Sequence, residues 1–308
     1  MGNYLITGGA GFIGSKVAEA LLARGDSVSI IDNISTGYES SIPEKAVFIK
    51  SDCQDAGVYR GLSGEKFDAI LHIAGQSSGE VSFDDPVYDL RSNTESTLHL
   101  LKFAFNSGCR RFIYASTMSV YGQPEMTRVN ENSVCAPISF YAVGKLASEN
   151  YLRIYEKYGM LSTSLRLFNV YGPGQNLENM RQGMVSIYLA QMIKKDRIIV
   201  KGSLERFRDF IYIDDVVRSF LLCLDLPQTV GKTLNVGTGI KTTVRDLLKI
   251  MLEIYSKDVP IVQDGSTMGD INGITADIDQ FRNVAGFVPE IQLKEGLHRM
   301  IQWALQTR

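Results

Sequence analysis

Residues 4–14, with the sequence Tyr-Leu-Ile-Thr-Gly-Gly-Ala-Gly-Phe-Ile-Gly, decide the fold of this 308-residue chain. The apolar run at 4–6 is long enough for one buried strand only, and a glycine-dense turn follows it directly. Apolar residues then recur at helical spacing up to Leu22, and Arg24-Gly25-Asp26 separates this helix from a second apolar strand at 28–31. The order strand, helix, strand predicts a β-α-β unit with a parallel sheet.

The glycines of the turn suit a dinucleotide. Gly8 permits a tight turn, Gly11 lets backbone N–H groups approach a pyrophosphate, and Gly14 lets the helix pack close to the sheet. The unpaired N–H groups at the start of the helix then face the phosphates. Asp32 ends the second strand, where a carboxylate meets an adenosine ribose and repels a 2′-phosphate, so we predict NAD rather than NADP. The alternative is a glycine-rich turn without a ligand.

Composition and charge exclude several other classes of protein. The formal net charge is −2 and basic residues are scattered, which disfavours nucleic acid and anionic membranes as partners. The four cysteines form no C-x-x-C pair and the three histidines show no ligand spacing, so we expect no metal. A first strand at Asn3 leaves no room for a signal peptide, and no apolar run approaches the length of a membrane span. We therefore expect a cytoplasmic protein.

The second, third and fourth strands end in loops that belong to the same edge of the sheet. A polar loop at 33–37 follows the second strand, and Asp52 with Cys53 follows a third strand at 47–49. Asp52 suits either the adenine amino group or the cap of the next helix. The fourth strand, 68–74, ends in a run of small residues from Gly75, where a ribose or phosphate could approach the backbone. His72 inside this strand is predicted to be a packed, hydrogen-bonded core residue.

A fifth strand at 111–115 leads to hydroxyl side chains at its carboxyl end, among them Ser116 and Thr117. A long helix is predicted before it, from Pro86 to about residue 106, ended by Gly108. Tyr141 and Lys145 lie four residues apart on a later helix and so share one face. A nearby ammonium stabilises a phenolate, so we expect the pKa of Tyr141 to fall from its usual value of about 10 toward working pH. This pair would make a general base for alcohol oxidation, although such pairs also arise by chance.

Together these motifs resemble the extended short-chain dehydrogenases/reductases, specifically the NAD-dependent nucleotide-sugar epimerases and dehydratases. The resemblance spans nearly the whole chain. It rests on Gly8-x-x-Gly11-x-x-Gly14, His72-Ile-Ala-Gly75, Ser116-Thr117, Val120-Tyr-Gly122, Tyr141-x-x-x-Lys145, Arg166-Leu-Phe-Asn169-Val-Tyr-Gly-Pro173, Arg208-Asp-Phe-Ile-Tyr-Ile-Asp-Asp215 and Asn235-Val-Gly-Thr-Gly239.

The resemblance implies a Rossmann-type doubly wound α/β fold with a smaller interleaved C-terminal substrate domain and a homodimer. The NAD-binding domain would take 1–166 and 208–236, and the nucleotide-sugar domain 167–207 and 237–308. Tyr141 would be the base, Lys145 would tune it and bind the nicotinamide ribose, and Thr117 would hold the reacting hydroxyl. The predicted cofactor contacts are Gly8, Gly11, Phe12, Ile13, Gly14, Asp32, Asn33, Ser35, Thr36, Gly37, Asp52, Cys53, Ile73, Ala74, Gly75, Gln76, Asn93, Ser116, Tyr141, Lys145 and Phe168. The predicted substrate contacts are Ser78, Thr117, Tyr141, Asn169 and Arg208, the last two on the diphosphate.

The residues after Thr117 choose between branches of the family. Sugar-nucleotide 4,6-dehydratases resemble Thr-Asp-Glu-Val-Tyr-Gly here, and UDP-glucuronate decarboxylases usually carry Glu where Ser119 stands. This chain has Met118 and Ser119, with neither carboxylate. A 4-epimerase needs only Tyr, Lys and Ser or Thr. We therefore predict C4 epimerisation of a UDP-hexose or UDP-N-acetylhexosamine through a transient 4-keto sugar, with NAD regenerated in each turnover.

Some positions depart from the family pattern and keep alternatives open. Met118 is bulkier than the usual small residue, and Glu80 could be an acid or base for another reaction. A family Arg is replaced by Thr267, so either Arg181 or Arg282 would take its place at the diphosphate, or the substrate differs from ordinary UDP-hexoses. An ion pair with Glu205 or Asp209 is the alternative role for Arg208. A dehydratase, lyase or reductase on the same scaffold is the second hypothesis, and a non-catalytic NAD-binding regulator the third.

Overall fold

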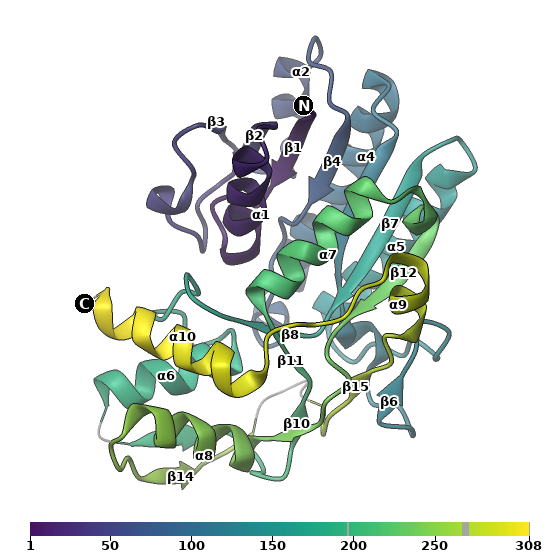
Figure 1. The fold of residues 1–308 in the computed structure, drawn as a ribbon. Coiled ribbons are helices and arrows are strands. Elements are labelled where there is room, and N and C mark those ends of the chain that lie inside the picture. Colours follow the sequence, from purple (N-terminus) through teal and green to yellow (C-terminus); the bar gives the residue numbers. More distant parts are fainter. Residues whose placement is uncertain (196, 267–270, 308) are drawn as a thin grey trace.

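The computed structural model describes residues 1–195, 197–266 and 271–307, and its centre is a seven-stranded parallel sheet (Figure 1). β1 lies inside the sheet, with two strands on one side of it and four on the other. The chain therefore winds outward in both directions from β1, which is the doubly wound arrangement predicted from the sequence. The strands in spatial order are β12 (Lys232–Val236), β7 (Leu161–Leu167), β5 (Arg111–Thr117), β4 (Ala69–His72), β1 (Asn3–Thr7), β2 (Ser27–Asp32) and β3 (Val47–Lys50).

The turn between β1 and helix α1 (Phe12–Ala23) has the geometry that its glycines require. Gly8 adopts φ +76°, a left-handed conformation that favours glycine. A Cβ on Gly14 would overlap the carbonyl group of Gly8, so only glycine lets α1 begin this close to the strand. The predicted β-α-β unit is confirmed, because β2 follows α1 and pairs with β1 in parallel, Leu5 opposite Ser29.

Side chains alternate between the two faces of the sheet, and each face has its own layer of helices. Ile6 and Ile30 pack with α1 and α7 (Ile213–Asp225), whose Phe220 is fully buried. Leu5 and Ile31 belong to the opposite core, together with residues of α4 (Ser96–Ser107) and α5 (Phe140–Glu156). The helix α2 (Ala56–Gly61) belongs to this second layer, where its Tyr59 stacks on Phe103 of α4.

The helix predicted from Pro86 to about residue 106 is interrupted. It consists of α3 (Pro86–Leu90), one π-helical stretch at Arg91–Glu95, and α4, which ends at Gly108 with φ +80° as predicted. Single π turns inside α-helices often occur at functional sites. Here the π turn carries Asn93, a predicted cofactor contact.

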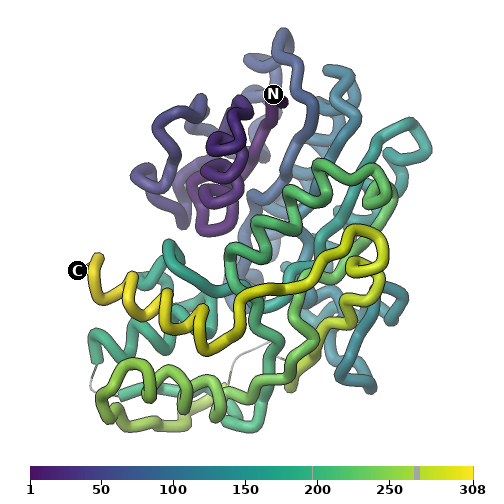
Figure 2. Tube along the Cα trace, viewed as in Figure 1, coloured from purple at the N-terminus to yellow at the C-terminus, as the bar shows by residue number. Residues whose placement is uncertain are grey.

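The rest of the chain forms a smaller part below the sheet (Figures 1 and 2). Three helices, α6 (Met184–Lys194), α8 (Val244–Tyr255) and α10 (Leu293–Gln306), share a second apolar core. Figure 2 shows that the chain leaves this part, returns to the sheet through α7 and β12, and ends beyond α10, far from the N-terminus. The remaining strands and helices are β6 (Arg128–Val129), β8 (Asn169–Tyr171), β9 (Ile198–Val200), β10 (Phe207–Arg208), β11 (Phe210–Tyr212), β13 (Thr242–Thr243), β14 (Ile261–Gln263), β15 (Thr275–Ala276) and α9 (Asp279–Ala285).

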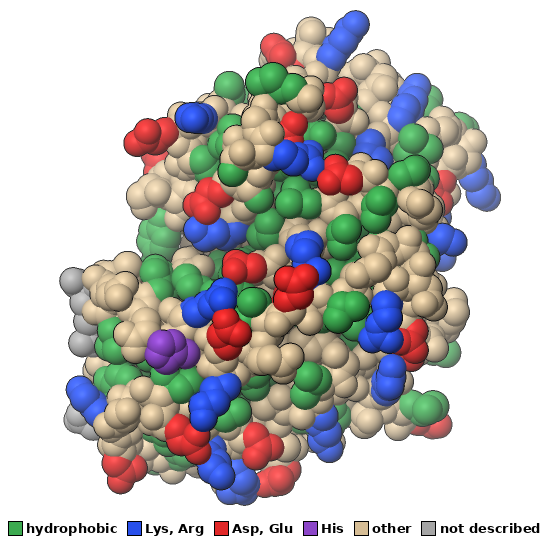
Figure 3. Space-filling view, viewed as in Figure 1, with side chains coloured by type: hydrophobic (Ala, Val, Ile, Leu, Met, Phe, Trp, Pro, Cys, Tyr) green, Lys and Arg blue, Asp and Glu red, His purple; other side chains and the backbone are tan. Residues whose placement is uncertain are grey.

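On the face drawn in Figure 3, acidic and basic side chains are interspersed over both parts of the molecule. Within the described residues, every helix is too short or too polar to cross a membrane.

Candidate active site

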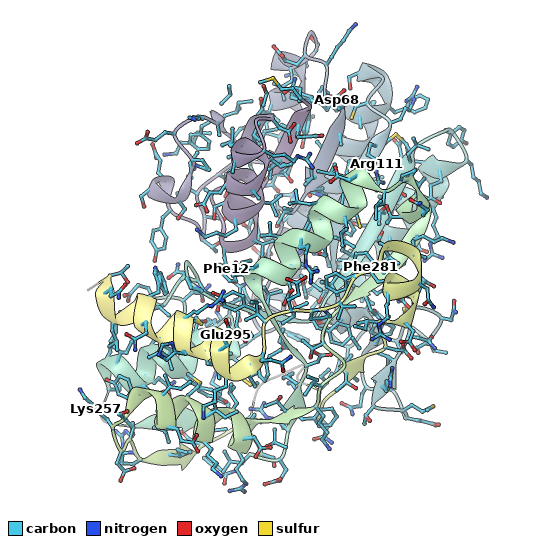
Figure 4. The ribbon with its side chains drawn as sticks, viewed as in Figure 1. Phe12, Asp68, Arg111, Lys257, Phe281 and Glu295 are labelled. Atoms are coloured by element: carbon cyan, nitrogen blue, oxygen red, sulfur yellow. The ribbon has the colours of Figure 1, made fainter. Side chains whose placement is uncertain are left out.

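A cavity of about 190 Å³ lies at the carboxyl edge of β1, β2, β3 and β4. These strands are parallel, so their carboxyl ends bring together segments that are far apart in the sequence, as expected for a ligand site in a doubly wound sheet. Figure 4 places Phe12, the first residue of α1, at the junction between the sheet and the smaller part. The predicted cofactor residues that line this cavity are Gly8, Gly11, Phe12, Ile13, Gly14, Asp32, Asn33, Ser35, Thr36, Gly37, Asp52, Cys53, Ile73, Ala74, Gly75 and Gln76.

The glycine turn leaves space for a ligand against bare backbone. A Cβ on Gly8 would lie 2.7 Å from the backbone nitrogen of Ala74, and one on Gly37 would overlap the carbonyl group of Ala10. The backbones of three loops therefore approach one another more closely than side chains would allow. Together with the start of α1, this fits a pyrophosphate held by N–H groups.

Two carboxylates at this edge have fixed orientations. Asp32 accepts hydrogen bonds from the N–H groups of Ala10 (2.9 Å) and Ile34 (2.7 Å), which holds it between the glycine turn and the loop at 33–37. Asp52 accepts from the Asn33 amide (2.7 Å). The cap of α2 is Asp55, which accepts from the Gly57 N–H, so the alternative role of Asp52 as that cap is wrong.

Tyr141, Lys145 and Thr117 lie together where β5 meets the start of α5, and all three are buried. Ser139 caps the helix by accepting from the N–H of Ala142, so the helix begins directly before Tyr141. The Lys145 ammonium donates to the carbonyl oxygen of Ala115 (3.0 Å) and lies 5.9 Å from the centre of the Tyr141 ring. The predicted catalytic residues are thus brought together by two elements that the sequence separates.

The pKa of Tyr141 differs from the expectation. Burial raises the pKa of Tyr141 to about 12, and the negative charge of Asp89 acts in the same direction, whereas the hydrogen bond with Thr117 lowers it. Burial lowers the pKa of Lys145 to about 8. The prediction of a lowered tyrosine pKa is therefore wrong for the protein groups alone, because the loss of hydration is the largest contribution to the shift.

His72 is a core residue, as predicted. Its ring nitrogens lie 2.7 Å from the Thr7 hydroxyl and 3.0 Å from the Thr97 hydroxyl, and burial lowers the pKa of His72 to about 3. The ring is therefore neutral and bound on both sides.

Five predicted cofactor contacts line neither cavity, namely Asn93, Ser116, Tyr141, Lys145 and Phe168. Ser116 donates to the buried Glu149 carboxylate (2.5 Å), because it points to the opposite face of β5 from Thr117. Phe168 packs among buried residues that include Met118 and Ile274. The side chains of Ser116 and Phe168 therefore lie in the protein interior, and a cofactor contact by either residue stays a prediction.

A second, larger cavity of about 620 Å³ adjoins the first. The predicted substrate residues Ser78, Asn169 and Arg208 line it, and so does Met118. Ser77 and Gln182 line both cavities and hydrogen-bond each other (2.5 Å), so they mark where the two meet. Further cationic side chains line this cavity, namely Arg181, Lys195, Lys201 and Arg206.

Arg208 is almost fully buried in the wall of this second cavity. Its guanidinium donates to the carbonyl oxygen of Phe207 (2.7 Å). The alternative ion-pair partners are engaged elsewhere: Glu205 accepts from Arg245, and Asp209 accepts from backbone N–H groups such as that of Gly239. A buried guanidinium in a cavity wall suits a ligand with phosphate oxygens.

The departures from the family pattern also have defined positions. Glu80 lines the second cavity and forms an ion pair with Lys201 (3.2 Å), and Arg181 pairs with Asp84. Arg282 pairs with Asp279 on α9 and lines neither cavity, so Arg181 is the candidate near the ligand. Thr267 lies outside the described residues.

The family model described as the NAD dependent epimerase/dehydratase family matches residues 4–237. This chain belongs to that family. It is 33% identical over 307 residues to a UDP-glucose 4-epimerase of Mycolicibacterium smegmatis, with 97% of each chain covered. A Thermotoga maritima UDP-glucose 4-epimerase solved with UDP-glucose has a similar structure, with a TM-score of 0.95, 33% identity and 99% of each chain covered. A UDP-N-acetylglucosamine 4-epimerase from Methanobrevibacter ruminantium, solved with UDP-N-acetylmuramic acid, has a TM-score of 0.93 and 27% identity, covering 100% of this chain and 99% of its own.

The fold prediction and the NAD prediction are confirmed by these relationships, and the chain is an NAD-dependent enzyme of nucleotide-sugar epimerisation. No sequence motif indicated Gln182, Lys195 or Lys201. These residues follow no strand of the central sheet, and they approach the cavity only through the packing of the smaller part. Polar clustering in the loop before α6 is the one feature that could have indicated Gln182.

Proposed function

We propose that this protein interconverts the C4 epimers of a UDP-hexose or UDP-N-acetylhexosamine. The observation that carries this proposal is the position of Tyr141, Lys145 and Thr117 between the two cavities. A Cβ on Gly75, in the wall of the first cavity, would lie 3.4 Å from the Lys145 nitrogen, and Met118, next to Thr117, lines the second. A dinucleotide in one cavity and a sugar nucleotide in the other would meet at these three side chains.

The three side chains have different tasks in this reaction. Thr117 holds the C4 hydroxyl group, Tyr141 takes its proton, and Lys145 orients the ribose of the cofactor while its charge favours the phenolate. Bound NAD supplies the acceptor for the C4 hydride and returns it to the sugar. Arg208 and Asn169 hold the diphosphate while the 4-keto sugar turns to present its other face.

The same geometry argues against a dehydratase. Elimination of water needs an acid and a base beside the sugar, and residues 118 and 119 supply neither. Glu80 is the carboxylate that lines the second cavity among the residues described, and Lys201 neutralises it. The proposed epimerisation needs no acid or base besides Tyr141, because bound NAD would accept the C4 hydride and give it back.

A proton NMR time course tests the proposal. The protein, with NAD, is incubated with a panel of UDP-, CDP-, GDP- and dTDP-sugars. A new anomeric signal from the C4 epimer, without net NADH, is expected for a UDP-hexose or UDP-N-acetylhexosamine. Olefinic or stable 4-keto products would contradict the proposal and support the lyase hypothesis.

We also propose a homodimer built on α3 and α5. Val143 and Ile154 on α5, with Val87 and Leu90 on the adjacent α3, are each about half exposed. Tyr158, just after α5, is 65% exposed. These side chains form one apolar surface on two neighbouring helices, which fits a self-complementary interface.

A charge in this surface should separate the subunits. Val143→Asp is expected to halve the mass measured by size exclusion with light scattering, because an unpaired carboxylate in an apolar interface is strongly unfavourable. Val47→Asp, at an exposed position on β3, is the matched control and should keep the mass of the wild type. A wild-type protein that is already monomeric would refute the homodimer.

The domain division follows from the same arrangement. We propose that 1–166 and 208–236 form the NAD-binding domain, and 167–207 with 237–308 the nucleotide-sugar domain. The return of the chain through α7 and β12 to the central sheet supports this division. A cytoplasmic location also stays a prediction.

A further inference from the structure

Gln76 holds the loop beside the second cavity in one conformation. Its side-chain amide donates to the carbonyl oxygen of Ser78 (2.7 Å), and its side-chain oxygen accepts from the N–H of the same residue (2.5 Å). If the Gln76 amide were rotated by half a turn, its NH2 group would face the N–H of Ser78 and its oxygen would face the Ser78 carbonyl oxygen. The loop therefore depends on the orientation of the Gln76 amide.

Asn93, on the π turn, also depends on the orientation of its amide. Its NH2 group donates to the carbonyl oxygen of Gln76 (2.9 Å) and to the carboxylate of Asp89 (3.1 Å). Its oxygen is buried and has no hydrogen-bond partner within the described part of the chain. A Cβ on Gly75 would overlap this oxygen and would lie 3.4 Å from the Lys145 nitrogen. The unpartnered acceptor is thus directed at the wall of the first cavity, beside the catalytic lysine.

Asp89 connects these two amides. One oxygen of its carboxylate accepts both from Gln76 (2.8 Å) and from Asn93 (3.1 Å), and its side chain is 1% exposed. A carboxylate only accepts when it is ionised, so both neighbours must direct their NH2 groups toward it. Asp89 and Asn93 are four residues apart, so their side chains lie on the same helical face. Asp89 belongs to α3, and Asn93 belongs to the π turn at Arg91–Glu95.

We propose that Asp89 is a positioning residue that orients the amides of Asn93 and Gln76, and so directs the Asn93 oxygen at a hydroxyl group of the bound dinucleotide. Asp89 itself lines neither cavity. Through Gln76 the same carboxylate also shapes the loop at 76–78 beside the sugar. The inference rests on the proposed function only in that the first cavity holds NAD.

The test compares NAD affinity in matched variants. Asp89→Leu keeps a side chain branched at Cγ but removes the acceptor, so the amides lose their orientation, and we expect NAD to bind about 10- to 100-fold more weakly in calorimetry of nucleotide-stripped protein. Asp89→Asn retains one acceptor oxygen at the same place. It should bind NAD within about threefold of the wild type and rescue the loss, consistent with the role of an acceptor.

A double-mutant cycle separates orientation from a general structural effect. If Asp89 acts through Asn93, Asp89→Leu should weaken NAD binding in the wild-type background but cause little further loss in an Asn93→Ala background. Equal losses in both backgrounds, or wild-type affinity in Asp89→Leu, would overturn the inference. If Asp89→Leu does not fold, Asp89→Ser, whose short side chain cannot reach both amides, replaces it in the same cycle. A wild-type protein that fails to bind NAD would instead refute the proposed function.

Discussion

Tyr141→Phe should abolish turnover while the fold and NAD binding remain. The substitution removes only the hydroxyl group that takes the C4 proton, and general acid–base groups contribute about 10²- to 10⁴-fold to rate. Because the ring is buried and its packing is unchanged, the melting temperature should move little. The measurement is the initial rate of C4 epimer formation by NMR, with bound NAD quantified on the same sample.

Tyr155→Phe is the matched control for this experiment. Tyr155 lies on the same helix, packs against Phe105 and lines neither cavity, so loss of its hydroxyl should leave the rate unchanged. Near-normal activity of Tyr141→Phe would remove Tyr141 from the mechanism. A pH profile adds a second criterion: burial holds the pKa of Tyr141 up and lowers the pKa of Lys145 to about 8, so the wild-type rate should rise with pH and then fall as Lys145 loses its charge.

Gly14→Ala is expected to cost both stability and cofactor binding. The new methyl group would overlap the carbonyl group of Gly8. Because that carbonyl is part of the backbone and not a flexible side chain, α1 must move away from β1. Overpacking of this kind typically costs about 1–3 kcal/mol of unfolding free energy. Displacement of the helix start from the glycine turn should weaken NAD binding at least about tenfold, which calorimetry measures directly.

Gly61→Ala separates this effect from a general effect of glycine substitution. Gly61 ends α2, is exposed, and a Cβ there meets nothing within 4 Å. Alanine at such a site is expected to stabilise the protein by up to about 1 kcal/mol, with NAD binding unchanged. If Gly14→Ala behaves like Gly61→Ala, the close approach of α1 to the turn is not required for NAD.

The sequence was sufficient for those parts of the site that follow from strand ends. Gly8 and the small residues after His72 directly follow a strand, Asp32 ends one, and Gly11 and Gly14 belong to the turn and helix start after β1; parallel strands bring such residues to one edge. The pairing of Tyr141 with Lys145 follows from helical spacing in the same way. These features need only local patterns and the topology of the sheet.

Other features depend on packing that no local pattern specifies. Ser116 and Thr117 look equivalent in the sequence, but alternation along β5 directs Ser116 to Glu149 and leaves Thr117 at the site. The helical pattern around Asn93 gives no indication of a π turn. The shift in the pKa of Tyr141 arises from burial by several elements, which sequence spacing cannot provide. The domain boundaries and the individual roles of the site residues stay predictions.

A substrate that carries deuterium on C4 tests the central claim most directly. If hydride leaves C4 and returns to the same carbon within one bound complex, the epimerised product in ordinary water should retain the deuterium at C4, as NMR and mass spectrometry would show. Appearance of solvent hydrogen at C4, or of deuterium at another carbon, would contradict a transient 4-keto sugar held between Tyr141 and the cofactor.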